Sequence, residues 1–320
     1  MRWGLWRMEK DKESPSPSGV YAALATPRHA GSIEADAGAL LDYLDAVVRA
    51  GVDGLVLFGS TGEFVHFDVS ERIRVLTLAI RRSRVPVLVN VSHSTLEGAL
   101  ELAENALGSG CAGVMLMPPY FYRYTDDQTF SFYQSFVKAI AGKARIYLYN
   151  LPFFTNALSS GLAERLLESG LFAGIKDSSG DWQLFETLSR IRAKFPFTLL
   201  LGSESLYVRG RMAGADGIVS GIAGAIPELP VAIERSIRAG DPARVQRLDA
   251  RLQELVQWMD QFPATVAIKK TAVARGWYLN ECAFPFDQTT NAALAAFEDW
   301  VRNWIPGVLA ECREAALAGA

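Results

Sequence analysis

A lysine, a tyrosine and a serine–threonine pair stand at the ends of apolar segments in this chain. Lys176 closes the run FAGIK, Tyr149 lies at the end of RIYLYN, and Ser60 and Thr61 follow GLVLF between two glycines. A buried lysine tends to lose its proton, and a neutral amine attacks a carbonyl carbon to form a Schiff base. A phenol can carry protons to and from the intermediates of that reaction. These residue types therefore point to carbonyl chemistry at Lys176.

Each of these residues also has a purely structural interpretation. Strands often end in a charged residue, so Lys176 could lie in solvent where its strand stops. The glycines around Ser60 and Thr61 let the backbone bend close to a ligand, and two hydroxyls with nearby amides could hold a carboxylate. The same stretch could instead be a turn that caps the next helix. The elements that position these residues have to decide between the two interpretations.

The composition excludes several classes of function. The chain has 320 residues, of which 50% are hydrophobic, and its net charge of −3 gives no electrostatic reason to bind nucleic acid or a membrane surface. No segment approaches the roughly 20 apolar residues of a membrane span. Three widely spaced cysteines predict reduced thiols and a cytoplasmic protein: Cys111, Cys282 and Cys312. The three histidines show no metal-ligand spacing, so we expect no metal: His29, His66 and His93.

Eight short apolar runs alternate with amphipathic stretches of helical spacing. They are rich in β-branched residues and do not alternate between apolar and polar positions, which is typical of strands buried on both faces. The predicted strands are 21–27, 54–58, 85–91, 113–117, 145–150, 172–176, 197–202 and 216–221.

This order predicts an α/β protein, a (β/α)8 TIM barrel with a C-terminal helical extension. A doubly wound open sheet is the alternative, but the first predicted strand is followed by no glycine-rich phosphate loop. We expect a flexible leader over 1–18, which has no signal-peptide core, the barrel over 19–238, and a helical region over 239–320 packed on the barrel.

Active sites of such barrels lie at the carboxyl ends of the strands. Lys176, Tyr149, Ser60 and Thr61 are all at or just past these ends, so we expect them to share one cavity. An amine, a phenol and a hydroxyl pair are what a Schiff-base aldolase needs, and the covalent lysine imine requires no metal or other cofactor.

Three motifs at these strand ends resemble the dihydrodipicolinate synthase/N-acetylneuraminate lyase family: GSTGE at 59–63, YNLP at 149–152 and GIKD at 174–177. The resemblance runs from about Val20 to the C-terminus. It implies the barrel with its C-terminal helices and assembly as a homotetramer or homodimer. It also implies a small-molecule 2-keto acid, pyruvate, as one reaction partner and an aldehyde as the other.

The resemblance further implies roles for single residues. Lys176 would form the Schiff base and Tyr149 would relay protons. Ser60 and Thr61 would hold the keto-acid carboxylate, with Thr61 also orienting Tyr149. Ser220 would lie near the pyruvate pocket. Glu63 is expected to be a structural hydrogen-bonding residue rather than a catalytic one.

Two positions depart from the dihydrodipicolinate synthase branch. That branch carries an arginine two residues after the proline of the Tyr-Asn-x-Pro stretch, where it grips the carboxylate of aspartate semialdehyde. Here the residue is Phe154, which cannot bind a carboxylate in a forked manner. The branch also has a second tyrosine after strand four that reaches the neighbouring subunit. Phe121 takes its place, although Tyr120, Tyr122 or Tyr124 could substitute if the loop shifts.

The sequence thus predicts a carbon–carbon lyase, a pyruvate-dependent aldolase of a 2-keto-3-deoxy acid. Phe153 and Phe154 favour a small or partly apolar aldehyde. The alternatives are a dihydrodipicolinate synthase or a keto-deoxy sugar-acid dehydratase. An alternative of another class is a non-catalytic keto-acid-binding protein on the same barrel.

Overall fold

The computed structural model describes residues 16–32, 34–140, 142–263, 265–278 and 282–314. Residues 1–15 of the predicted leader lie outside the described residues. Across the described ranges, no helix is long and apolar enough to cross a membrane.

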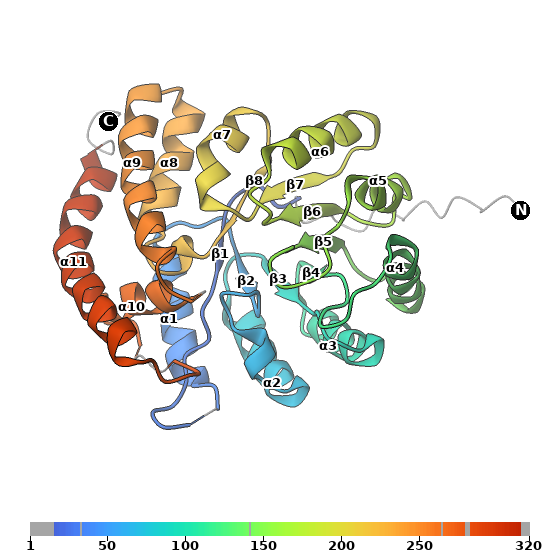
Figure 1. Ribbon diagram of the computed structural model, residues 1–320, viewed down its shortest axis with the longest axis horizontal. Coiled ribbons are helices and arrows are strands. Elements are labelled where there is room, and N and C mark those ends of the chain that lie inside the picture. Colours follow the sequence, from blue (N-terminus) through green and yellow to red (C-terminus); the bar gives the residue numbers. More distant parts are fainter. Residues whose placement is uncertain (1–15, 33, 141, 264, 279–281, 315–320) are drawn as a thin grey trace, which may run out of the picture.

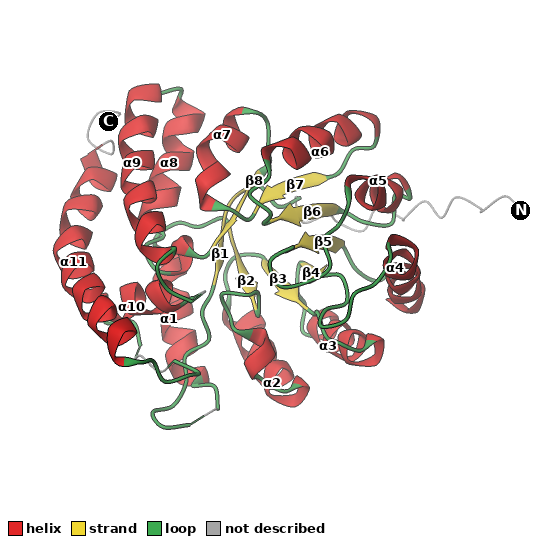
Figure 2. Ribbon diagram, viewed as in Figure 1, coloured by secondary structure: helices red, strands yellow, loops and turns green. Residues whose placement is uncertain are grey.

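The centre of the molecule is a closed barrel of parallel strands. Within the described residues, eight strands pair in chain order and β8 closes against β1. Figure 2 draws the strands in yellow at the centre of the ring of helices. The predicted TIM barrel is therefore confirmed. The strands are β1 (Gly19–Ala23), β2 (Gly54–Leu57), β3 (Val87–Asn90), β4 (Gly113–Leu116), β5 (Ile146–Asn150), β6 (Gly174–Asp177), β7 (Thr198–Leu201) and β8 (Gly217–Ser220).

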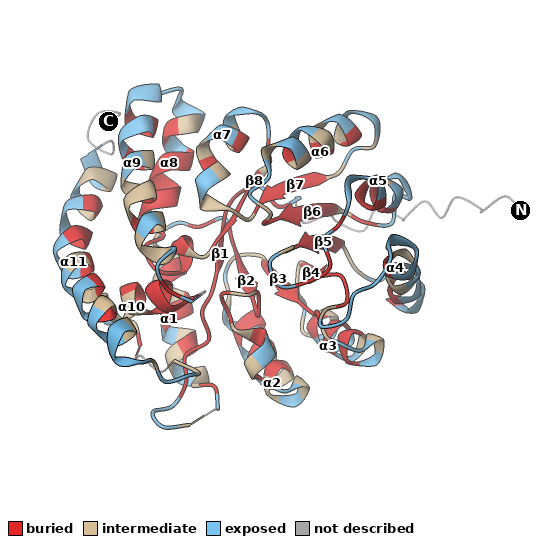
Figure 3. Ribbon diagram, in the orientation of Figure 1, coloured by how far each residue is buried: buried red, intermediate tan, exposed pale blue. Residues whose placement is uncertain are grey.

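The strands are apolar because the ring of helices covers them on the outside while their own side chains fill the interior. Every strand residue is buried, whereas the outer faces of the helices are exposed (Figure 3). The predicted first strand, 21–27, is wrong at both ends. The observed strand begins at Gly19, which pairs with Gly217, and the Thr26 hydroxyl already donates to the Gly62 carbonyl beyond the strand end.

One helix follows each strand on the outside of the barrel. Several begin at a side-chain cap: Asp36, Asp68 and Asp181 accept hydrogen bonds from backbone amides of the first helical turn. The barrel helices are α1 (Ala37–Arg49), α2 (Val69–Arg82), α3 (Leu96–Gly108), α4 (Asp126–Ile140), α5 (Ser160–Glu168), α6 (Trp182–Lys194), α7 (Tyr207–Met212) and α8 (Glu228–Ala239).

In the part of the chain that the structure describes, three more α-helices follow: α9 (Pro242–Met259), α10 (Val266–Ala274) and α11 (Gln288–Arg313). Helices α8, α9 and α11 lie side by side at one side of the barrel (Figure 1). We call the described part of 240–314, which follows α8, the C-terminal helical region; the predicted domain bounds stay a prediction. Helix α11 runs through Pro306, whose ring nitrogen cannot donate the helical hydrogen bond to the Arg302 carbonyl.

Candidate active site

Lys176 and Tyr149 are neighbours on adjacent strands. The register of β5 against β6 makes them Cα partners. Only 4% of Lys176 is exposed, so its strand does not end in solvent, and Tyr149 is fully buried. The Nζ atom of Lys176 lies 4.1 Å from the centroid of the Tyr149 ring. The Nζ atom of Lys176 thus lies over the face of the Tyr149 ring.

Ser60 approaches the same tyrosine from the other side of the barrel. It lies in the turn that follows β2, and its Oγ is 3.3 Å from the Tyr149 hydroxyl. The structure therefore brings Lys176, Tyr149 and Ser60 together. The hydroxyl within hydrogen-bond distance of the Tyr149 hydroxyl here is that of Ser60; the orienting role that the resemblance gives to Thr61 stays a prediction.

Thr61 lies beside the loop that follows β8. A Cβ atom on Gly221 would meet the Thr61 hydroxyl oxygen at 3.0 Å, a tight contact that the glycine avoids. Ser220 is fully buried at the end of β8, but its hydroxyl donates to a Glu204 carboxylate oxygen at 2.8 Å. Ser220 therefore anchors Glu204, which follows β7, and its hydroxyl hydrogen is engaged within the protein.

Gly202, directly after β7, makes room for the lysine. A Cβ atom at this position would lie 2.7 Å from Cε of Lys176. The sequence offers no sign of this requirement, since a glycine after a strand is ordinary turn chemistry. Behind the lysine, Asn150 Nδ2 donates to Asp177 Oδ1 at 2.7 Å, and Asn150 Oδ1 accepts from the Leu158 amide. This network fixes the ends of β5 and β6 relative to each other.

The surroundings of Tyr149 shift its acidity. Burial raises the pKa of this phenol, but the positive charge of Lys176 and the hydrogen bond from Ser60 oppose burial. The net effect is a pKa below the usual value of 10. Lys176 and Ser60 stabilise the phenolate, which suits a group that gives up and regains a proton.

The remaining predicted residues lie farther out on the loops. Tyr120 is half-buried, and its ring packs edge-on against Phe64 at 5.8 Å between centroids. Phe154 is 62% exposed on the loop after β5. Phe121 is 86% exposed and has a left-handed φ of 82°. These aromatic residues form an apolar rim on the carboxyl-end face of the barrel.

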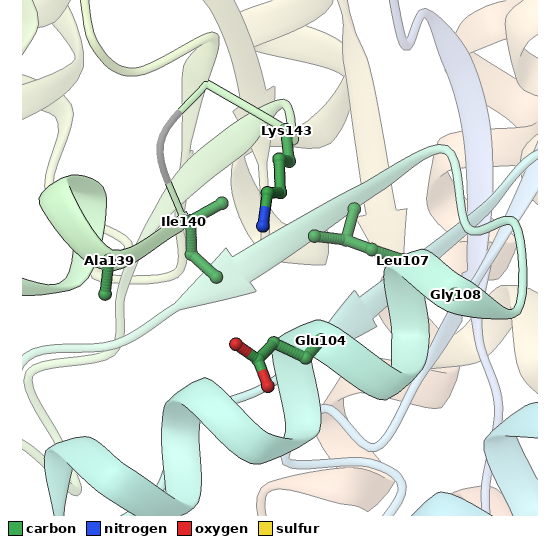
Figure 4. A pocket seen from close by; sticks show the side chains of 6 residues that line it. All are labelled: Glu104, Leu107, Gly108, Ala139, Ile140 and Lys143. Atoms are coloured by element: carbon green, nitrogen blue, oxygen red, sulfur yellow. The ribbon is translucent and has the colours of Figure 1, made fainter.

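Two further observations concern metal ligands and a surface pocket away from these residues. Among the described residues, no group of three or more histidine, cysteine, aspartate or glutamate side chains is placed to hold a metal ion. A surface pocket lies between the ends of α3 and α4, with the carboxylate of Glu104 and the ammonium of Lys143 on opposite sides (Figure 4). It is at the amino-end face of the barrel, where barrel enzymes do not place their chemistry.

Comparison with known proteins identifies the family. The model of the Dihydrodipicolinate synthetase family matches residues 16–303. The chain is 28% identical over 255 residues to the probable 2-dehydro-3-deoxy-D-pentonate aldolase YjhH of Escherichia coli, covering 77% of this chain and 81% of that protein. It is 30% identical over 264 residues to a 4-hydroxy-tetrahydrodipicolinate synthase of Sorangium cellulosum, covering 81% of this chain and 87% of that protein.

A solved structure gives the same fold. YagE of Escherichia coli, a prophage protein of the dihydrodipicolinic acid synthase family solved in complex with pyruvate, superposes with a TM-score of 0.81. The match covers 91% of this chain and 98% of that one at 23% identity.

Proposed function

The chain belongs to the dihydrodipicolinate synthetase family, whose members are lyases, and from that premise we propose that it is a Schiff-base aldolase. It cleaves, or forms, a 2-keto-3-deoxy acid from pyruvate and an aldehyde, with Lys176 as the nucleophile. One observation carries the proposal. The buried Lys176 amine lies 4.1 Å from the ring of Tyr149, whose hydroxyl meets Ser60 at 3.3 Å.

The reaction needs proton transfers at the keto oxygen, at the C4 hydroxyl and at C3, all close to the lysine. The neutral amine of Lys176 adds to the keto carbon C2, and Tyr149 protonates the departing oxygen, which leaves as water. The resulting iminium withdraws the electron pair of the C3–C4 bond as that bond breaks. Tyr149 accepts the C4 hydroxyl proton as the aldehyde departs, and it can then give that proton to C3 of the enamine. Water adds to the resulting iminium, which releases pyruvate and the amine of Lys176 and returns a proton to Tyr149.

Ser60 and Thr61 supply the binding of the keto acid in this proposal. Their hydroxyls and the amides of the turn after β2 would hold the carboxylate that is common to pyruvate and every 2-keto-3-deoxy acid. A carboxylate held there would put the keto carbon between that turn and Lys176. Ser60 then has a second task, because its Oγ also orients the Tyr149 hydroxyl at 3.3 Å.

The experiment that tests the proposal is borohydride trapping. The protein is incubated with pyruvate and reduced, and the modified peptide is located by mass spectrometry. We expect a single reduced pyruvate adduct on Lys176. A folded protein that gains no adduct, or gains it on another lysine, would contradict the mechanism.

We predict that the enzyme does not condense pyruvate with aspartate semialdehyde. Phe154 stands where the synthase branch carries its arginine, and a phenyl ring cannot replace the forked hydrogen bonds to the second carboxylate. The measurement is consumption of aspartate semialdehyde with pyruvate, run beside cleavage assays on a panel of 2-keto-3-deoxy acids. Efficient turnover of aspartate semialdehyde would favour the synthase alternative instead.

A further inference from the structure

The turn that carries Ser60 and Thr61 is bounded by two strained residues. Phe58 has a φ of 54° and Glu63 a φ of 52°, both in the left-handed region that residues with a side chain seldom adopt. Neither is a glycine, so the backbone does not hold this shape unaided. Surrounding contacts must therefore stabilise each end of the turn.

The barrel itself holds the Phe58 end. The Phe58 carbonyl accepts a hydrogen bond from Asn90 Nδ2 at 2.7 Å. Asn90 is at the end of β3, and its own carbonyl accepts from the buried Arg72 guanidinium at 2.7 Å. This end is fixed by residues of neighbouring strand–helix units.

The Glu63 end has a contact from the barrel, the hydrogen bond from Thr26 to the Gly62 carbonyl, and a second one from outside it. Lys269 Nζ lies 2.5 Å from Glu63 Oε2, and the Lys269 side chain is 1% exposed. Lys269 belongs to α10 in the C-terminal helical region, 206 residues further along the chain. A buried pair of this kind fixes its partners because breaking it leaves an uncompensated charge.

The same helix touches the site at a second point. A Cβ atom on Gly221 would meet Ile268 Cδ1 at 2.6 Å and the Thr61 hydroxyl at 3.0 Å. Ile268 and Thr61 thus lie against one glycine, next to the lysine that holds Glu63. Helix α10 forms part of the wall behind the serine–threonine turn.

We propose that Lys269 is a positioning residue for the reaction: it holds Glu63 in its left-handed conformation and thereby places Ser60 and Thr61 for the keto-acid carboxylate. This inference rests on the proposed function. Lys269 does not touch the substrate. Its removal leaves the Lys176 nucleophile in place on β6 and disturbs the turn that binds the carboxylate.

The test compares two adjacent lysines. Lys269→Met removes the contact to Glu63, whereas Lys270→Met removes an ion pair of the same 2.5 Å length to Glu298 on α11. We expect Lys269→Met to raise the half-saturating pyruvate concentration for borohydride trapping by about tenfold or more. At saturating pyruvate the adduct should still form on Lys176. We expect Lys270→Met to change the concentration by less than about twofold, because its partner Glu298 lies on α11 and not in the turn.

A double variant identifies the route of the effect. Glycine adopts a positive φ readily. Glu63→Gly in the Lys269→Met background therefore lets the turn take its wild-type conformation, and it removes the carboxylate that has lost Lys269 as its partner. We expect the half-saturating pyruvate concentration of the double variant to be at least about threefold lower than that of Lys269→Met alone. The double variant can also be compared directly with the wild type if Lys269→Met alone does not fold. Equal effects of the two lysine variants, no effect of Lys269→Met, or a double variant as weak as the single one would each overturn the proposal.

Hydrogen exchange separates this inference from the proposed function. Peptides covering residues 58–66 should exchange faster in Lys269→Met than in the wild type, and should be unchanged in Lys270→Met. Wild-type protein that forms no adduct would end the Schiff-base proposal, while the exchange of the turn would still test the role of Lys269. Unchanged exchange in Lys269→Met would refute that role even in an active enzyme.

Discussion

Replacing Lys176 by methionine should abolish both pyruvate trapping and turnover. Methionine fills a similar volume but offers no amine, so no imine can form and the electron sink for C3–C4 cleavage is lost. We expect activity to fall by about 10⁵-fold or more, as when a covalent nucleophile is removed. The measurements are single-turnover cleavage of a 2-keto-3-deoxy acid and borohydride trapping followed by intact mass.

Two controls show that this loss comes from chemistry and not from unfolding. The melting temperature of Lys176→Met should equal or exceed that of the wild type, since the change replaces a buried polar amine by an apolar side chain. The pKa of Tyr149 should rise, because burial raises it and the opposing charge of Lys176 is gone. The difference between ultraviolet pH titrations of a protein with Tyr149 and of Tyr149→Phe reports the ionisation of this phenol. In Lys176→Met the phenolate of Tyr149 should appear at a higher pH than in the wild type. Retained turnover would eliminate the Schiff-base mechanism.

Replacing Tyr149 by phenylalanine should slow the reaction by roughly 10²–10⁴-fold, the range for a single general acid–base group. The ring that faces Lys176 is kept, so the nucleophile stays in position. The phenol that protonates the departing oxygen and accepts the C4 proton is lost. Imine formation should continue slowly, so prolonged incubation with pyruvate and borohydride should still label Lys176.

The matched control for this variant is Tyr147→Phe. Tyr147 lies two residues earlier on β5 and is also buried, but it pairs in register with Gly174, near the start of β6. The hydroxyl removed there is one barrel layer away from the chemistry. We expect Tyr147→Phe to keep most of the wild-type rate, and timed borohydride quenches give imine formation for both variants. A Tyr149→Phe enzyme as fast as Tyr147→Phe would show that another group moves the protons.

Local sequence patterns were sufficient for the architecture. Runs of β-branched residues and helices with polar outer faces are properties of ten to fifteen consecutive residues, so the alternation of eight strands and helices could be read directly. The residues at which the strands begin and end were harder to predict from the sequence. Strand β1 starts at Gly19 because Gly19 pairs with Gly217, a partner nearly 200 residues away, and no local pattern contains that pairing.

The amino-acid sequence by itself determined the chemistry available at the site: an amine at Lys176, a phenol at Tyr149 and hydroxyls at Ser60 and Thr61, each at a strand end. Tertiary structure alone decided how they meet. The register between β5 and β6 makes Lys176 and Tyr149 partners, and Gly202 leaves room for the lysine. Lys269 looks like an ordinary surface lysine in its own helix, and it becomes an anchor of the Ser60–Thr61 turn only because α10 packs over Glu63. Such contacts join residues far apart in the chain, and their geometry depends on the packing of whole elements.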